Sequence, residues 1–146
     1  MKINKECLQL IKSYEGCHLT AYICPAGKPT IGYGHTGPEV KIGMTITQTI
    51  ANQMLESDIN RFSVGVRAFL KKNLNDNQFS ALVSFAYNCG IGSFAGSTLL
   101  KYVNSGNFLA AAHEFGKWNR SGGKILPGLV ARRQAEVKLF LKEVHA

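Results

Sequence analysis

The stretch from residue 47 to residue 72 carries apolar side chains at helical spacing for longer than any other part of the chain. Its apolar members are Ile50, Met54, Leu55, Ile59, Phe62, Val66, Phe69 and Leu70. About 25 helical residues, at a rise of about 1.5 Å each, form a rod of roughly 37 Å. That is long for a domain of 146 residues. A helix of this length usually connects two lobes, and a cleft between lobes is a common place for a polymer to bind.

The residues before this helix predict a short helix followed by a small sheet. Apolar residues recur at helical spacing from Asn4 to Tyr14, and Gly16 supplies a natural stop. The residues from His18 to Ile23 and from Pro29 to Tyr33 are typical of strands, and the letters CPAGK between them are typical of a turn. A β-hairpin is therefore predicted. A third short strand is predicted around residues 39–42.

The residues after the long helix predict helices only. Asp76 is predicted to cap a helix that ends at Gly90, and three more helices are predicted over residues 97–104, 108–118 and 128–144. The chain is therefore expected to be α+β and mostly helical, in one domain with a cleft between two lobes. The expected parts are a small N-terminal β-hairpin lobe (15–46), a linking helix (47–72) and a larger helical lobe (1–14 and 73–146).

The formal net charge of +8 favours an anionic partner, such as nucleic acid, a membrane surface or a cell envelope, or else serves solubility alone. The basic residues are scattered from Lys2 to Lys142 with no block of five, which favours a diffuse positive surface over a nucleic-acid stripe. No apolar run approaches the roughly 18 residues that span a bilayer. The first residues lack the features of a signal peptide. We therefore expect a soluble cytoplasmic protein with no stable membrane insertion.

The cysteines and histidines show no metal-binding pattern. The cysteines Cys7, Cys17, Cys24 and Cys89 form no CxxC pair and no zinc spacing. The histidines are His18, His35, His113 and His145, and none belongs to an HExxH motif. We expect reduced thiols, with Cys7 and Cys89 in the core, and no metal or organic cofactor.

The stretch from Tyr14 to Gly37 contains the candidate chemistry. Glu15 lies at a predicted helix end, where the negative pole of the helix dipole favours the protonated form that an acid catalyst needs. Cys24 follows nine residues later in the hairpin turn, and Thr30 follows after six more. One acid facing a hairpin that holds a thiol and a hydroxyl is a layout suited to hydrolysis.

The glycines of this stretch also match the dinucleotide pattern GxGxxG, at Gly32, Gly34 and Gly37. Pro38 follows where a helix should begin, and no βαβ unit surrounds the motif, so we expect these glycines to allow sharp turns and a close approach to a ligand. Asp58 falls on or beside the apolar stripe of the long helix. A buried carboxylate needs a partner, and His35 is the candidate.

Three residues further along have two interpretations each. Tyr87 either stacks on a sugar in the cleft or belongs to the core. Arg132 and Arg133 lie in the last predicted helix. Either at least one of them faces inward or flanks the cleft, or both are solvated.

The sequence resembles the phage-type lysozymes of glycoside hydrolase family 24. The resemblance includes the residues named above and extends over nearly the whole chain. The shared motifs are YEG at Tyr14–Gly16, AY at Ala21–Tyr22, TIGYGHTG at Thr30–Gly37, NQFSALVSFAYNCG at Asn77–Gly90, STLL at Ser97–Leu100, and KWNRSGG followed by GLVARRQAE up to Glu136. The resemblance implies two lobes joined by a long helix. It also implies hydrolysis of the β-1,4 bond between N-acetylmuramic acid and N-acetylglucosamine in peptidoglycan.

The resemblance also implies roles for individual residues. The family's catalytic pattern falls on Glu15, Cys24 and Thr30. Substrate contacts are expected from Gly32 and Tyr33 in the glycine-rich corner, and from Tyr87 and Asn88, which match positions on the cleft floor. The family's histidine–aspartate ion pair falls on His35 and Asp58. An arginine that pairs with the acid across the lobes falls on Arg133, where it would oppose the effect of the helix end on Glu15.

Cys24 departs from the commoner aspartate of the family, so the hairpin offers no second carboxylate. A thiol with an ordinary pKa of about 8.5 is mostly neutral at pH 7. The hypothesis is therefore a single displacement with inversion, in which Glu15 protonates the leaving oxygen while Thr30 and Cys24 position a water. Cys24 as a covalent nucleophile is the alternative.

We therefore expect a phage or prophage endolysin that acts as a monomer. It should accumulate in the host cytoplasm and need a holin-type membrane lesion to reach peptidoglycan. A lytic transglycosylase, which cleaves the same bond with one glutamate and no water, is the nearest rival. A non-catalytic module that binds peptidoglycan or nucleic acid through its positive charge is the rival from another class.

Overall fold

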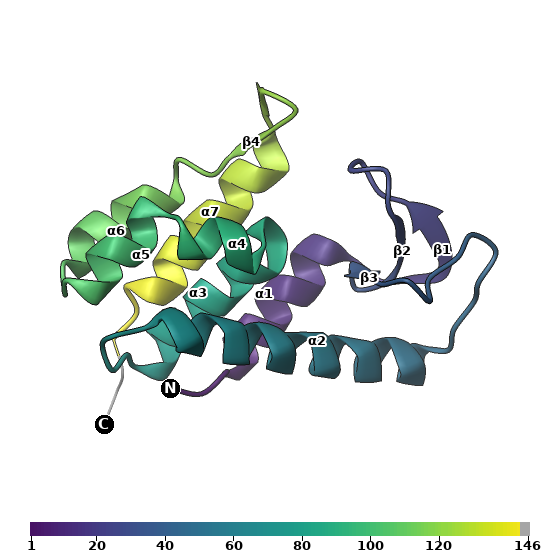
Figure 1. Ribbon diagram of the computed structural model, residues 1–146, viewed down its shortest axis with the longest axis horizontal. Coiled ribbons are helices and arrows are strands. Elements are labelled where there is room, and N and C mark those ends of the chain that lie inside the picture. The colour runs from purple at the N-terminus through teal and green to yellow at the C-terminus, as the bar shows by residue number, and fades with distance from the viewer. Residues whose placement is uncertain (144–146) are drawn as a thin grey trace. The chain divides into compact units, whose positions relative to one another are not determined.

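The computed structural model describes residues 1–143, and within them the chain is mostly helical with a few short strands (Figure 1). This confirms the predicted α+β, mostly helical class. The chain divides into two compact units. We call Ile11–Arg61 the hairpin unit, and Met1–Leu10 together with the chain from Phe62 onward the helical unit.

The hairpin unit contains the small sheet. The sheet has the order β1 (His18–Ile23), β2 (Pro29–Gly32), β3 (His35–Thr36), and both pairings are antiparallel. The unit also contains the last residues of α1 (Lys5–Glu15) and the first part of α2 (Gln48–Phe69). The predicted hairpin and both helices are confirmed, and α2 is the longest helix in the described part of the chain.

The predicted third strand at residues 39–42 is wrong. The third strand is β3, where Thr36 lies opposite Thr30 of β2. Residues 38–43 instead form turns, because Pro38 has no backbone N–H to donate to a sheet and Gly43 takes a positive φ of 91°. The chain then returns to the other edge of β1, where Thr20 forms a bridge with Thr45.

The pairing of β1 with β2 is irregular between His18 and Tyr22 and regular from Tyr22 to Ile23. One face of this hairpin forms the core of the hairpin unit. Ala21 of β1 and Ile31 of β2 are buried there with Val40. Met44, Ile46 and Met54 pack against this cluster. Because successive residues of a strand point to opposite faces, the neighbours of Ala21 and Ile31 point to the other face of the hairpin.

The helical unit has five further helices and a second hairpin. These elements are α3 (Asp76–Cys89), α4 (Ile91–Ala95), α5 (Thr98–Asn104), α6 (Phe108–Phe115), β4 (Arg120–Ser121), β5 (Lys124–Ile125) and α7 (Pro127–Phe140). Helix α7 packs against α3 and α6, as Figure 1 shows within this unit. The rings of Phe85, Phe115 and Phe140 meet at centroid distances of 5.4–5.7 Å in the core.

Several predicted boundaries and caps need correction. The cap of α3 is Asn75, not Asp76: its side chain accepts a hydrogen bond from the backbone N–H of Gln78, and the Gln78 side chain accepts one from the backbone N–H of Asn75. Asp76 instead accepts a hydrogen bond from the backbone N–H of Lys2 at 2.8 Å. No pattern in the sequence predicted α4 or the β4–β5 hairpin. A helix of five residues and strands of two residues each are too short to show a periodic pattern of apolar side chains.

The last helix was predicted to run to Val144, and the described helix α7 ends at Phe140. Val144 and His145 lie outside the described residues. None of the helices in the described part of the chain is both long and apolar enough to cross a membrane.

Candidate active site

Glu15 is the last residue of α1, and its carboxyl group lies against the glycine-rich corner. The helix ends because Gly16 has a φ of 67° while its N–H still bonds to the Lys12 carbonyl at 3.0 Å. A Cβ atom placed on Gly34 would lie 2.7 Å from Oε1 of Glu15. Gly34 therefore leaves the space that the carboxyl group occupies. The close approach of this corner to a ligand stays a prediction.

The hairpin presents its polar residues on the face opposite the core. Tyr22 of β1 lies directly opposite Thr30 of β2, so both side chains project to the same side. The pairing continues past β1, because the N–H of Cys24 donates to the Lys28 carbonyl at 3.0 Å. Cys24, two residues after Tyr22, is therefore on this side as well.

The Thr30 side chain changes the acidity of the Cys24 thiol. Hydrogen bonds from the Thr30 hydroxyl and then from the Lys28 backbone lower the pKa of Cys24 below its ordinary value. The Thr30 hydroxyl also donates to the Lys28 carbonyl at 2.9 Å. Because a hydroxyl has one proton, Thr30 donates to this carbonyl beside a neutral thiol and can turn to donate to the thiolate when Cys24 ionises.

The thiols of Cys7 and Cys89 have the opposite tendency. Burial raises the pKa of Cys7 to about 12. Burial also raises the pKa of Cys89, although the Arg133 guanidinium opposes the change. In the described part of the chain, Cys24 is the cysteine whose surroundings favour the thiolate.

Tyr22 belongs to this site and was not among the predicted site residues. Its ring is half-buried and contacts the His18 ring at a centroid distance of 4.4 Å. Burial raises the pKa of its phenol, and the negative charges of Glu15 and Cys24 raise it further. Tyr22 is part of the AY motif that supports the resemblance. The catalytic spacing includes only Glu15, Cys24 and Thr30, so it gives no indication of a role for Tyr22.

His35 lies between two carboxylates, and the predicted contact with Asp58 is present. Its Nδ1 is 2.7 Å from Oδ2 of Asp58, and its Nε2 is 2.7 Å from Oε1 of Glu39. Asp58 is buried and also pairs with Arg61 at 3.4 Å. Burial alone would lower the pKa of His35, but its hydrogen bonds to Glu39 and Asp58 outweigh burial and raise the pKa. The same bond with His35 lowers the pKa of Glu39.

The predicted substrate residues Gly32 and Tyr33 flank this region of the hairpin unit. Gly32 is buried, and a Cβ atom there would meet Ile46 and Ala51 at 3.7–3.8 Å, so it packs against the core. The Tyr33 hydroxyl accepts a hydrogen bond from Nε2 of Gln48 at 3.1 Å. Their contact with substrate stays a prediction.

The remaining predicted residues belong to the helical unit. Tyr87 packs its ring 5.2 Å from that of Phe62. Asn88 accepts a hydrogen bond from Arg133 at 2.8 Å. Glu15 belongs to the hairpin unit and Arg133 to the helical unit, so the pairing of these two residues stays a prediction.

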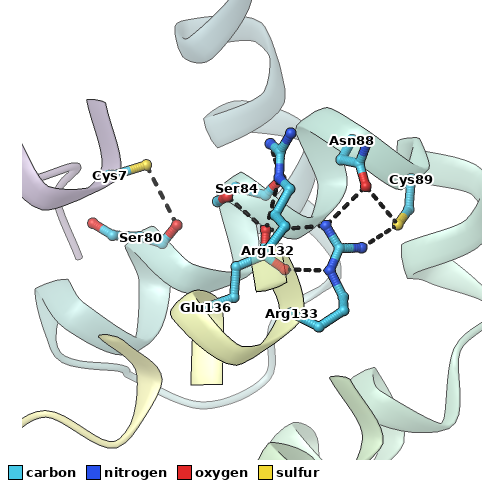
Figure 2. Close-up of polar contacts among 8 residues, drawn as sticks. All are labelled: Cys7, Ser80, Ser84, Asn88, Cys89, Arg132, Arg133 and Glu136. Carbon is cyan, nitrogen blue, oxygen red and sulfur yellow. Dashed lines mark hydrogen bonds and ion pairs between the residues drawn. The ribbon is translucent and has the colours of Figure 1, made fainter. Parts of the chain in front are cut away.

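Arg132 and Arg133 are both buried, with exposed fractions of 2% and 1% (Figure 2). Both contact the Glu136 carboxylate, Arg132 at 3.3 Å and Arg133 at 2.8 Å. The Ser84 hydroxyl donates to the same carboxylate at 2.6 Å. Figure 2 also shows Arg133 extending to Asn88 and Cys89 at the end of α3. The Arg132 guanidinium also donates to the Ser84 carbonyl of α3 at 3.2 Å, and these contacts hold α7 to α3.

Residues 1–143 contain no cluster of three or more His, Cys, Asp or Glu side chains that could hold a metal ion. On the polar side of the hairpin, Glu15 supplies a carboxyl group, Cys24 an acidified thiol, and Tyr22 and Thr30 one hydroxyl each. Such a set can donate a proton to one side of a ligand and accept one on the other.

Comparisons with known proteins identify relatives of the whole chain. A family model described as phage lysozyme matches residues 12–136. The endolysin of Bacillus phage B103 is 49% identical over 97% of this chain and 54% of its own length. The endolysin of Acyrthosiphon pisum secondary endosymbiont phage 1 is 44% identical over 96% of this chain and 98% of its own. The chain spans about half the length of the Bacillus phage relatives that it matches.

Among solved structures, the muramidase domain of SpmX from Asticaccaulis excentricus is 36% identical to this chain, with a TM-score of 0.89. The match covers 97% of this chain and 99% of that one.

Replacing Thr30 by Val should slow the reaction of Cys24 with iodoacetamide at pH 7. The substitution keeps the shape of the side chain and removes the hydroxyl that stabilises the thiolate. Because alkylation follows the thiolate fraction, we expect a rate about threefold to tenfold lower. Mass spectrometry of digested peptides measures the rate, with Cys17 as an internal reference. Thr36→Val, opposite Thr30 on β3, is the matched control, and an equal effect in both variants would contradict the assignment.

The contact between His35 and Glu39 should stabilise the fold most strongly between about pH 4.5 and pH 6.5. His35 has a raised pKa, so its contribution is complete below the unfolded value and is lost as the pH rises through the folded value. Glu39 has a lowered pKa, so its contribution is lost as the pH falls through the folded value. The destabilisation by Glu39→Gln, measured by urea unfolding, should therefore be largest near pH 5.5 and disappear by pH 9.

The exposed Glu56 of α2 provides the control Glu56→Gln for this measurement. A Glu39→Gln effect that stays constant from pH 5.5 to pH 9 would show that the charge on His35 contributes nothing to the contact.

Proposed function

Because this chain belongs to the phage lysozyme family, we propose that it is an endolysin muramidase. The proposed reaction is hydrolysis of the β-1,4 bond between N-acetylmuramic acid and N-acetylglucosamine in peptidoglycan, the activity of glycoside hydrolase family 24. The whole of residues 1–146 forms the catalytic domain in this proposal. Lysis of the bacterial host is the biological outcome.

One observation carries the proposal: a carboxyl group at the end of α1 lies over Gly34, in the same unit as a hairpin that presents Cys24 and Thr30 on one side. A glycosidase needs an acid for the leaving oxygen and a second group on the other side of the sugar ring. Glu15 supplies the first. The acidified thiol with its Thr30 hydrogen bond supplies the second.

The proposed reaction is a single displacement with inversion. Glu15 gives its proton to the glycosidic oxygen while the bond between that oxygen and C1 breaks. A water held by Thr30 and Cys24 forms the new bond to C1 from the opposite side, and its proton passes to the Cys24 thiolate. Glu15 ends as a carboxylate and Cys24 as a thiol, and proton exchange with solvent restores both.

Two other reactions use the same residues differently. In a double displacement the Cys24 thiolate attacks C1 itself and forms a covalent thioglycoside that water then hydrolyses. In a lytic transglycosylase the 6-hydroxyl of the muramic acid attacks C1 and leaves a 1,6-anhydro sugar. The lowered pKa of Cys24 favours the thiolate that both single and double displacement use in this chain.

The proposal extends to location and partners. The protein acts as a monomer on peptidoglycan without a metal or organic cofactor. It collects in the host cytoplasm, and a holin-type protein opens the membrane to release it to the cell wall. The net charge of +8 favours encounter with an anionic envelope.

Replacing Glu15 by Gln should abolish lysis of bacterial cell walls while leaving binding to them intact. The amide keeps the shape of the side chain and cannot donate the proton, so we expect a loss of at least about a hundredfold. Turbidity of a cell-wall suspension measures lysis, and co-sedimentation with intact walls measures binding. Glu56→Gln, at an exposed position of α2, is the matched control. Lysis by the Glu15→Gln variant at the normal rate would refute the proposal.

Early products should carry a reducing muramic acid end in the α configuration. Hydrolysis creates a reducing end that borohydride labels, and inversion of a β-bond gives the α anomer before mutarotation. NMR of the first products reports both. A β anomer, together with a sugar adduct on Cys24 in mass spectrometry, would favour the double displacement. An unlabelled 1,6-anhydro end would favour the transglycosylase.

A further inference from the structure

The strand pairing that places Thr30 in the site places one more side chain beside it. Tyr22 lies directly opposite Thr30, on the side of the hairpin that carries Cys24. Ala21 and Ile31, its neighbours in the alternation, are buried in the core. The side chain of Tyr22 is therefore fixed on the reactive side of the hairpin by the same register that fixes the core.

The His18 ring steadies this side chain. The two ring centroids are 4.4 Å apart with the planes tilted by 47°. A tyrosine has two rotatable side-chain bonds, so one ring contact and a half-buried position are enough to limit its orientation. A pre-ordered ring loses little further freedom when a ligand binds.

The hydroxyl of Tyr22 has no hydrogen-bond partner among residues 1–143. It lies close enough to Glu15 and Cys24 to sense their charges. Those charges, together with burial, raise the pKa of the phenol, so the hydroxyl stays protonated at neutral pH and acts as a hydrogen-bond donor.

We propose that Tyr22 is a saccharide-binding residue whose hydroxyl donates a hydrogen bond to an oxygen of the sugar held between Glu15 and Cys24, with His18 fixing the ring. This inference rests on the proposed muramidase function and deepens it. The ligand that satisfies the hydroxyl is an acceptor oxygen of a sugar hydroxyl, ring or acetamido group. A donor at this point orients the sugar ring relative to the acid above Gly34.

Replacing Tyr22 by Phe removes the hydroxyl and keeps the ring and its contact with His18. On a soluble peptidoglycan saccharide, KM should rise about tenfold while kcat changes less than twofold, because the bond forms in both ground state and transition state. Tyr102→Phe removes a hydroxyl from α5 in the helical unit and is the matched control, with unchanged kinetics.

A binding measurement tests the inference without turnover. In a Glu15→Gln background, calorimetry with a tetrasaccharide of alternating N-acetylglucosamine and N-acetylmuramic acid should give about tenfold weaker binding when Tyr22→Phe is added. The alkylation rate of Cys24 and the thermal midpoint report whether the hairpin keeps its geometry in the variant.

Each outcome has one meaning. A rise in KM with an unchanged Cys24 alkylation rate supports the inference. Wild-type affinity and kinetics in Tyr22→Phe overturn it, and so does a fall in kcat accompanied by altered alkylation of Cys24, which indicates a structural role. A wild-type chain that neither cleaves nor binds the saccharide overturns the proposed function itself.

Discussion

The antiparallel pairing of β1 with β2 is the constraint on which the rest of the hairpin unit depends. Tyr22 lies opposite Thr30, and this register assigns Ala21 and Ile31 to the core and their neighbours to the reactive side. A slip of one residue in one strand would exchange its two faces, burying polar groups and exposing the apolar ones. The apolar core therefore enforces the arrangement of the polar residues. Burial of a few aliphatic side chains, worth about 1.5–3 kcal/mol each, gives that register its energetic preference.

The thiol in place of a second carboxylate has a physical consequence for charge. Two carboxylates a few ångströms apart repel each other, and one of them must usually hold a proton. A thiol is mostly neutral unless donors stabilise its anion, and here the Thr30 hydroxyl and a backbone amide do so. In the proposed reaction Glu15 starts protonated beside a thiolate and ends as a carboxylate beside a thiol. The site then carries one negative charge before and after the step, so the protein around it needs little electrostatic reorganisation.

The sequence predicted the long helix, the hairpin and the end of the first helix, because each has a clear periodic or turn signal of its own. Local signals failed where the structure depends on long-range pairing. The third strand forms at His35–Thr36 and not at residues 39–42, because it pairs with β2. The contact between His35 and Asp58 was expected because a buried carboxylate needs a partner, and the resemblance implied it as well, whereas no pattern indicated Glu39 as a second partner. Tyr22 escaped notice because its position depends on strand register. Arg132 and Arg133 are both buried because Glu136, one turn further along α7, compensates them.

The distribution of charge separates long-range attraction from chemistry. The hairpin unit has four basic and four acidic residues, so its net charge is zero. The helical unit has thirteen basic and five acidic residues and therefore carries the entire net charge of +8. Arg132 and Arg133 are buried members of this set. The others act on an anionic surface over a range of about 8 Å at physiological salt, and added salt weakens them. The bonds at Glu15, Thr30 and Cys24 act at contact distance and are much less sensitive to salt. In the proposed function, attraction to the envelope and cleavage of the polymer therefore depend on different parts of the sequence, and substitutions can change one without the other.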